Sequence, residues 1–150
     1  MNSHQAIELL KRLIATPSVS REESAAADIV VAEFERCGFT PKRKGNNVWA
    51  EAWAYDPAKP TILLDAHIDT VKPNAQWQRE PFSPTVEGDR LYGLGSNDTG
   101  GSLVAMIATF TQIASTRQAY NLIMLASAEE EVTGVNGVRA VLPELPPIDF

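Results

Sequence analysis

Three short groups of polar side chains are the parts of this 150-residue sequence that could do chemistry. They are centred on His67 and Asp69, on Asp98, and on Glu129, Glu130 and Glu131. The chain has one cysteine, Cys37, and two histidines, so neither an intrachain disulfide nor an all-cysteine zinc site can form. Any metal site must therefore be built mainly from carboxylates.

The first group is a histidine and an aspartate two residues apart. In an extended chain, side chains at this spacing point to the same side. A metal-binding histidine usually donates its second ring N–H to a carboxylate or carbonyl, and Asp69 suits that role or the role of a ligand for the metal. Taken alone, His67 and Asp69 fit a hydrogen-bonded polar end of a strand better than a metal site.

The second group lies in the glycine-rich segment Gly93-Leu94-Gly95-Ser96-Asn97-Asp98-Thr99-Gly100-Gly101. A dinucleotide-binding fingerprint needs glycine at the sixth position, and Asp98 stands there, so that function is not indicated. The flanking glycines allow unusual backbone angles that would aim the Asp98 carboxylate. The alternative is that Asp98 only caps the helix that follows.

The third group is the glutamate triplet after the apolar run 121–126. Three adjacent carboxylates repel one another, so at the end of a strand they need a compensating cation. Because neighbouring side chains diverge, one of them could bind a metal while the next faces a substrate. The alternative is a solvated, acidic first turn of a helix, where negative charge suits the helix dipole.

The elements that must position these groups are two predicted buried strands, 61–64 and 121–126, which lead into the first and third groups. In open α/β sheets, ligands bind beyond the carboxyl ends of the strands. A histidine and an aspartate after one strand, a pair of glutamates after the other and a glycine-framed aspartate between them together predict a carboxylate-rich site for two metal ions. Zinc suits such donors, and cobalt or manganese could replace it.

The remaining pattern predicts an α/β fold with a mostly parallel sheet, because strands alternate with helices. Capping boxes at Asn2–Gln5 and Ser20–Glu23 predict helices that end before Pro17 and at Gly38. The other predicted elements are a hairpin around residues 45–47, an exposed connection over 70–84, a short strand over 89–93, helices over 100–114 and 135–143, and the start of a further strand at the end of the chain.

Composition excludes several classes of protein. The hydrophobic fraction of 44% and charged fraction of 21% are those of a globular domain. With 13 basic and 19 acidic residues the net charge is −6, and the one basic run is Lys42-Arg43-Lys44, so no nucleic-acid partner is expected. No apolar run approaches the ~20 residues of a membrane helix, and no secretory signal is visible. We therefore expect a cytoplasmic protein without a membrane partner.

The three groups, in this order and at this spacing, resemble the N-terminal motifs of the M20 metallopeptidase/deacylase family. The matching segments are 64–71, 93–101 and 126–131, so the resemblance covers essentially the whole chain. This family includes acetylornithine deacetylase, succinyl-diaminopimelate desuccinylase, aminoacylases and glutamate carboxypeptidase. The resemblance implies a three-layer α/β/α zinc-exopeptidase-like catalytic domain with a mostly parallel mixed sheet, incomplete in this chain.

The resemblance also implies roles for the first two groups at a site with two zinc ions. His67 is expected to bind one metal ion and Asp69 to orient that histidine. Asp98 is expected to bridge the two ions, and the Asp98–Thr99 peptide is expected to be cis. The substrate-binding residues are not implied by any motif of this chain.

For the third group, the resemblance leaves two registers. The family motif is usually Asp-Glu-Glu, and here it is Glu-Glu-Glu. Aligning the preceding small residues makes Glu130 the general base and Glu131 the ligand of the second metal ion. A slip of one residue would instead make Glu129 the base and Glu130 the ligand.

The implied function is a metal-dependent amidohydrolase that removes an N-acyl group from an amino acid. The segment Asp69-Thr70-Val71-Lys72-Pro73 and the glycine-rich segment are most similar to acetylornithine deacetylase-like enzymes, which implies a role in arginine biosynthesis. A desuccinylase, a dipeptidase or carboxypeptidase would carry the same motifs. The other alternative is a non-catalytic metal-binding relative, but such relatives often lack the general base, which is present here as Glu130.

Members of this family are more than twice as long as this chain. The resemblance therefore implies that residues 1–150 correspond to the N-terminal portion of the catalytic domain, and that the lid or dimerisation domain, a second acidic ligand and a late histidine ligand are expected outside this chain. His4 is expected at the surface and does not replace that histidine. We therefore expect the isolated chain to bind zinc weakly and to be inactive, and the full-length protein to be a homodimer.

Overall fold

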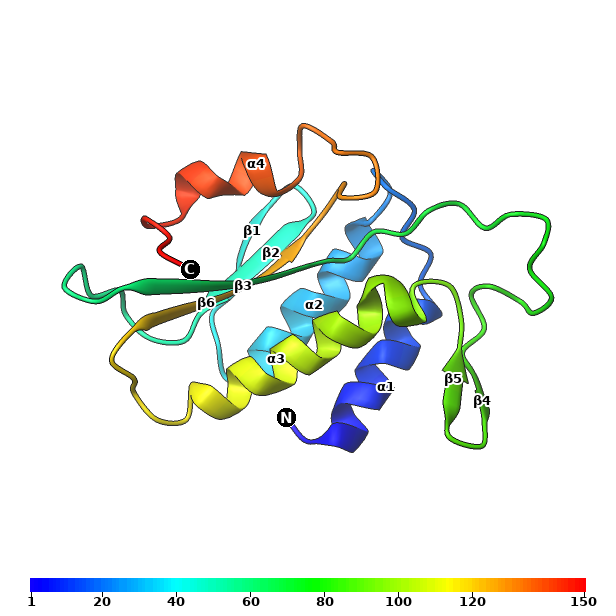
Figure 1. Ribbon diagram of the computed structural model, residues 1–150, viewed down its shortest axis with the longest axis horizontal. Coiled ribbons are helices and arrows are strands. Elements are labelled where there is room, and N and C mark those ends of the chain that lie inside the picture. Colours follow the sequence, from blue (N-terminus) through cyan, green and yellow to red (C-terminus); the bar gives the residue numbers. More distant parts are fainter.

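The computed structural model describes residues 1–150 as a four-stranded sheet with helices on both faces and a separate hairpin (Figure 1). The helices are α1 (Ser3–Ile14), α2 (Ser24–Arg36), α3 (Gly101–Ile113) and α4 (Val138–Val141). The strands are β1 (Lys42–Lys44), β2 (Asn47–Glu51), β3 (Thr61–His67), β4 (Thr85–Glu87), β5 (Arg90–Tyr92) and β6 (Asn121–Ser127). No helix is long and apolar enough to cross a membrane.

The sheet has the strand order β1-β2-β6-β3, and β6 is its fully buried centre. β3 runs parallel to β6, with Thr61 opposite Asn121 and His67 opposite Ser127. β2 is antiparallel to both β1 and β6. The α/β class and a mixed sheet are confirmed. Within this chain the predicted parallel majority is wrong, because β3–β6 is the one parallel pair: β1 and β2 form a hairpin, which must be antiparallel, and β2 also runs antiparallel to β6.

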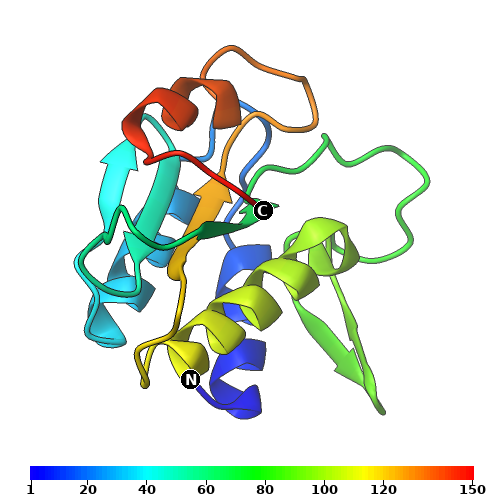
Figure 2. The same cartoon turned by 60° about the vertical axis from the view of Figure 1, so that its left-hand side comes forward.

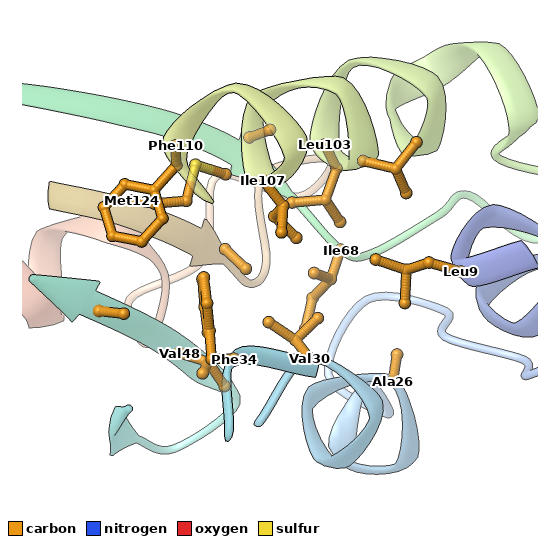
Figure 3. Close-up of a cluster of buried hydrophobic side chains, with 14 of the residues drawn as sticks. Leu9, Ala26, Val30, Phe34, Val48, Ile68, Leu103, Ile107, Phe110 and Met124 are labelled. Atoms are coloured by element: carbon orange, nitrogen blue, oxygen red, sulfur yellow. The ribbon is translucent and has the colours of Figure 1, made fainter. Parts of the chain in front are cut away.

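The layers follow from which face of the sheet each helix covers. Figure 1 shows α2 and α3 below the sheet and α4 above it, and Figure 2 shows α1 beside α3 on the lower side. The larger core lies between these helices and the sheet and includes Phe34, Ile107, Phe110 and Met124 (Figure 3). A smaller cluster packs on the other face; it consists of Trp49, Ile123, Leu125, Val141 and Leu145. The predicted three layers are therefore present, with the upper layer represented by one short helix.

Of the two predicted capping boxes, one is confirmed and the other is wrong. In α1 the Asn2 side chain accepts from the Gln5 N–H and the Gln5 side chain accepts from the Asn2 N–H, as predicted. The box at Ser20 and Glu23 is wrong: α2 begins at Ser24 without a side-chain cap. The chain turns at Arg21, where φ is +78°, and this turn directs the Ser20 hydroxyl to Asp69 instead.

Several predicted boundaries shift. The strand predicted over 89–93 is half of the β4–β5 hairpin, and the helix predicted over 135–143 is α4 followed by a single 3₁₀ turn at Leu142–Glu144, which contains Pro143. Residues 71–80 are all exposed, and this connection extends away from the body of the domain (Figure 2). The last two residues form backbone hydrogen bonds with Thr61 and Leu63, along the free edge of β3.

The aromatic centre of the larger core gives a prediction about stability. Phe34 is fully buried, and its ring meets those of Phe39 and Phe110 edge to face. Phe34→Ala leaves a large cavity in this core, so we expect the free energy of unfolding to fall by about 3–5 kcal/mol. Urea denaturation measures this loss. Val135→Ala, at a position that is 83% exposed, is the control and should change stability by less than about 0.5 kcal/mol. A loss below about 1 kcal/mol for Phe34→Ala would contradict this packing.

Candidate metal centre

The parallel pairing of β3 and β6 brings two of the three polar groups to one edge of the sheet. His67 is the last residue of β3 and lies opposite Ser127, the last residue of β6. The pairing continues one step further, because the Ile68 N–H donates to the Ser127 carbonyl at 2.8 Å. Asp69 and Glu130 are therefore held within a few residues of the last paired positions.

The carboxylate of Asp69 is buried and fully used as an acceptor. Its Oδ2 accepts from the Ser20 hydroxyl at 2.7 Å and from the Glu131 N–H at 3.2 Å, and its Oδ1 accepts from the Glu130 N–H at 3.1 Å. Burial alone would raise the pKa of Asp69. The hydrogen bonds from His67, Ser20 and the two backbone amides outweigh burial and lower it. Asp69 is thus a fixed negative charge beneath the site.

His67 is held between this carboxylate and the open side of the site. Its Nδ1 lies 2.9 Å from the Asp69 carbonyl oxygen and 3.4 Å from Asp69 Oδ1. Its Nε2 lies 3.1 Å from Asp98 Oδ1 and 3.7 Å from Glu130 Oε2. The hydrogen bond with the Asp69 carboxylate, against the opposing effect of burial, raises the pKa of His67 to about 9. The ring is therefore oriented by Asp69 so that Nε2 faces the other carboxylates, as metal-binding histidines are.

Asp98 reaches the site because the glycine-rich segment forms an irregular turn. Gly95 has φ +76°, a left-handed conformation, and a Cβ on Gly100 would lie 2.7 Å from both the Gly95 carbonyl oxygen and a methyl group of Leu10. The expected cis peptide is present at Asp98–Thr99. The capping alternative for Asp98 is not what the structure shows: α3 has Gly100 at its N-cap and no side-chain cap, and the Asp98 side chain is 76% exposed beside His67.

The three glutamates diverge, as expected of adjacent side chains. Glu129 has φ +54°, and its buried carboxylate accepts from the backbone N–H and the side-chain amide of Asn136, at 3.3 and 2.9 Å. Glu130 and Glu131 instead point to the open side, above the Asp69 carboxylate that binds their N–H groups. Partial burial and the negative charge of Asp98 raise the pKa of Glu131. The Glu129 carboxylate thus faces Asn136 and not His67 or Asp98.

Three residues form a cluster with the geometry that a metal ion requires. Ligand atoms of His67, Asp98 and Glu131 all lie within 4.8 Å of one another. One imidazole nitrogen and two carboxylates are a donor set that suits zinc. Partial burial, with the neighbouring Asp98 carboxylate, raises the pKa of Glu131, and a bound cation would favour its charged form. The residues present therefore fit a metal ion.

Two hollows flank the cluster and leave room for a ligand. One, of about 320 Å³, is lined by Val71, Trp77, the glycine-rich segment and Glu131. The other, of about 260 Å³, lies beyond Glu130 and is lined by Asp65, Val138 and Arg139 among others. Both are open to solvent at the carboxyl end of the sheet, where ligands of α/β folds bind.

Sequence reasoning missed a group of polar residues beneath the cluster, of which Glu23 and Asn47 are buried and Ser20 is half-buried. Ser20, Glu23 and Asn47 are distant in sequence from the three motifs, but their side chains accept from or donate to the segments that carry them. The signal in the sequence was Ser20-Arg21-Glu22-Glu23, which resembles a capping box and has no feature that marks it as buried. Only the tertiary structure shows that Ser20 and Glu23 are hydrogen-bond partners of the site segments and not a helix cap.

The fold and the cluster define an α/β domain with a candidate metal centre at the carboxyl ends of its parallel strands. Residues 63–150, more than half of the chain, match the model of peptidase family M20/M25/M40, and the chain belongs to this family. The resemblance seen in the three motifs is thereby confirmed.

Curated relatives named succinyl-diaminopimelate desuccinylase match nearly the whole chain. The protein of Buchnera aphidicola subsp. Acyrthosiphon pisum (strain Tuc7) is 32% identical over 142 residues, which cover 92% of this chain and 38% of that protein. The protein of Blochmanniella floridana is 34% identical over 148 residues, which cover 93% of this chain and 38% of that protein. The chain therefore spans about two fifths of the length of these relatives.

Solved structures show the same fold. An M20 family metallo-carboxypeptidase from Sulfolobus solfataricus superposes with a TM-score of 0.74 and 29% identity, over 91% of this chain and 33% of that one. Human carnosine dipeptidase 1 superposes with a TM-score of 0.70 and 21% identity, over 94% of this chain and 35% of that one. A Bacillus subtilis protein described as a dinuclear metal-binding peptidase from family M20 has a TM-score of 0.69 and 20% identity, over 93% and 38% of the two chains. The two likenesses at 20–21% identity show the fold alone.

The raised pKa of His67 gives a prediction about pH. A histidine whose pKa is about 9 in the folded chain and about 6.5 when unfolded stabilises the fold fully below pH 6.5, and this stabilisation is lost as the pH rises through 9. In the metal-free chain, kept in EDTA, we expect the free energy of unfolding to fall between these values. The ring protons of His67 should titrate in NMR spectra with a midpoint near 9.

A variant His4→Gln leaves His67 as the single histidine and so assigns its signal. Asp69→Asn removes the main cause of the shift and should lower the midpoint. A midpoint at or below 7 in the unaltered chain would contradict the hydrogen bond between His67 and Asp69.

Proposed function

We propose that the protein carrying this chain is a metal-dependent hydrolase that cleaves the amide bond of an N-acyl amino acid, and that residues 1–150 are the N-terminal portion of its catalytic domain. The observation that carries this proposal is the convergence of His67, Asp98 and Glu131 within 4.8 Å, with Glu130 beside them. Membership of peptidase family M20/M25/M40 supports the reaction class.

The metal ligands in this proposal are His67, Asp98 and Glu131. We propose that the complete site would hold two zinc ions and that Asp98 would contribute to binding both, and Co²⁺ or Mn²⁺ would suit the same donors. The Bacillus subtilis relative described as dinuclear supports the number. When bound, the metal supplies a Lewis acid for the substrate carbonyl and lowers the pKa of water. Residues of this chain supply three protein ligands, so we propose that the 150 residues alone bind zinc weakly.

Glu130 is the general base in this proposal. Its side chain is 60% exposed and reaches to 3.7 Å from His67 Nε2, while its backbone N–H is fixed by Asp69. From this position its carboxylate can accept a proton from the attacking water and return that proton to the leaving amine. Glu129 is held by Asn136 instead, which supports the register with Glu130 as base and Glu131 as ligand. Asp69 positions His67 and does not touch the substrate.

The substrate is proposed as an N-acyl amino acid, with acetyl and succinyl as the candidate acyl groups. The motifs alone are most similar to acetylornithine deacetylase, whereas the curated relatives described above are desuccinylases. Their identity to this chain supports an N-succinyl amino acid as a candidate beside the N-acetyl amino acid. Dipeptides are the third class, because a dipeptidase has the same fold.

The experiment that tests the function is hydrolysis of three substrates by the full-length protein: N-acetylornithine, N-succinyl-diaminopimelate and a dipeptide. We expect zinc-dependent release of the amine from one of the two N-acyl amino acids, abolished by EDTA and restored by zinc. The isolated 150-residue chain is the negative control. Preference for the dipeptide would replace the substrate class, and no zinc-dependent hydrolysis of any of the three would favour a non-catalytic metal-binding relative.

The role of Glu130 can be tested against its neighbour. Glu130→Gln removes the proton acceptor and leaves all three ligands, so we expect kcat to fall by about 10²–10⁴-fold with zinc content unchanged. Glu129→Gln is the matched control, because it changes an adjacent carboxylate that faces Asn136, and it should lower kcat by less than tenfold. Zinc content is measured by elemental analysis. The reverse order of the two losses would establish the register with Glu129 as base.

A further inference from the structure

We infer that Glu23, together with Asn46, is a positioning residue for the segment that carries Glu130 and Glu131. This inference rests on the proposed function, because it concerns the base and a ligand of that site. Glu23 lies 106 residues before Glu129 in sequence and outside all three motifs.

The backbone N–H groups of the segment after β6 are hydrogen-bonded to side chains from other parts of the chain. Four consecutive N–H groups donate to side chains: Ala128 to Asn47 Oδ1 at 2.9 Å, Glu129 to Glu23 Oε1 at 3.3 Å, Glu130 to Asp69 Oδ1 at 3.1 Å and Glu131 to Asp69 Oδ2 at 3.2 Å. Because neither a helix nor a strand fixes this segment, its conformation depends on three acceptor side chains from elsewhere in the chain.

Glu23 is the most deeply buried of these acceptors that carries charge. Its relative exposure is 0%, and its partners are the N–H groups of Arg21 and Glu129 and the side-chain amide of Asn46, at 2.6, 3.3 and 2.7 Å. None of these partners is a cation. A buried carboxylate without a cation is costly unless its oxygens are hydrogen-bonded, so the three donors must be held in place around Glu23.

The position of the Glu129 N–H decides where the next two side chains point. Glu129 has φ +54°, which turns its own side chain toward Asn136 and the following residues toward Asp69. Loss of the acceptor at Glu23 would leave a buried N–H at this turn without a partner. The turn would then relax, and the carboxylates of Glu130 and Glu131 would move relative to His67 and Asp98.

Asn46, in the turn between β1 and β2, is the third hydrogen-bond donor to Glu23. Its amide nitrogen donates to Glu23 Oε2, and its oxygen accepts from Arg43 at 3.3 Å. An exchange of donor and acceptor is therefore possible across this pair. In Glu23→Gln with Asn46→Asp, the new amide would donate to the new carboxylate, and the remaining oxygen at position 23 would still accept from Arg21 and Glu129. The total charge of the pair would be unchanged.

The test uses the full-length protein with Glu23→Gln, Asn46→Asp and the double variant, and Glu144→Gln as control. Glu144 is an exposed carboxylate paired with Lys44, distant in sequence from every site residue. Three quantities are measured: zinc affinity by competition with a chelator, the visible absorption spectrum of the Co²⁺-substituted protein, and kcat and KM. Circular dichroism confirms that each variant is folded at the assay temperature.

We expect Asn46→Asp, which sets a second carboxylate against Glu23, to lose about 10-fold or more in zinc affinity or kcat, with KM changed less than threefold and the Co²⁺ spectrum altered. Glu23→Gln keeps the oxygen that accepts from Glu129 and replaces only the oxygen that faces the Asn46 amide, so its loss should be smaller. The double variant should recover to within about threefold of the unaltered protein. Unchanged Co²⁺ spectrum, zinc affinity and kcat in the folded Asn46→Asp variant would overturn the inference, even if its melting temperature falls. So would a double variant no better than the worse single variant.

Failure of the proposed function gives a different result. In that case the unaltered protein hydrolyses none of the substrates, while zinc affinity and the Co²⁺ spectrum still report whether Glu23 and Asn46 hold the ligand segment.

Discussion

The candidate site depends above all on one buried negative charge, the carboxylate of Asp69. An ionised carboxylate that leaves water must have its oxygens hydrogen-bonded, and Asp69 obtains its donors from three separate parts of the chain. The Ser20 hydroxyl comes from before α2, the Glu130 and Glu131 N–H groups come from after β6, and His67 comes from the end of β3. None of these segments can move away without leaving the charge under-satisfied, so one side chain holds together Glu130, Glu131 and His67, which we propose as the base and two of the metal ligands.

The sheet makes this arrangement possible because two of its neighbouring strands, the edge strand β3 and the central strand β6, are parallel. β3 and β6 pair over seven residues and end side by side, which brings the chain after each strand to the same edge. Beyond that edge the regular hydrogen-bond ladder stops, and side chains replace it as acceptors: Asn47 from β2, Glu23 from the start of α2, and Asp69 from after β3. Buried polar contacts therefore position the segment that carries Glu130 and Glu131. The apolar core of Phe34, Ile107 and Phe110 instead holds the helices against the sheet.

Much of this could be predicted from the sequence, because the signals were local. The capping box at Asn2, the buried strands and the apolar face of α3 are patterns within a short window, and the cluster of His67, Asp98 and Glu131 followed from a family resemblance. The predictions that failed depended on contacts between residues that are distant in sequence. Ser20 and Glu23 have the spacing of a cap, but a positive φ at Arg21 turns Ser20 toward Asp69, and burial turns Glu23 inward. Likewise, the sequence alone does not show which of the three glutamates faces the site. The structure shows that Glu129 faces Asn136 instead.

The charges around His67 explain why this arrangement suits a cation. Its ring lies within 4 Å of carboxylate oxygens of Asp69, Asp98 and Glu130, and Glu131 adds a fourth carboxylate whose pKa is raised. Without a metal, the proton on His67 is the one positive charge among them. The hydrogen bonds with Asp69, and a smaller one with Asp98, outweigh burial and raise the pKa of His67 to about 9. A metal ion binds the neutral imidazole, so binding must release that proton and replace one positive charge by two. The same carboxylates that retain the proton therefore favour its exchange for a divalent ion, and the balance between the two shifts toward the metal as the pH rises.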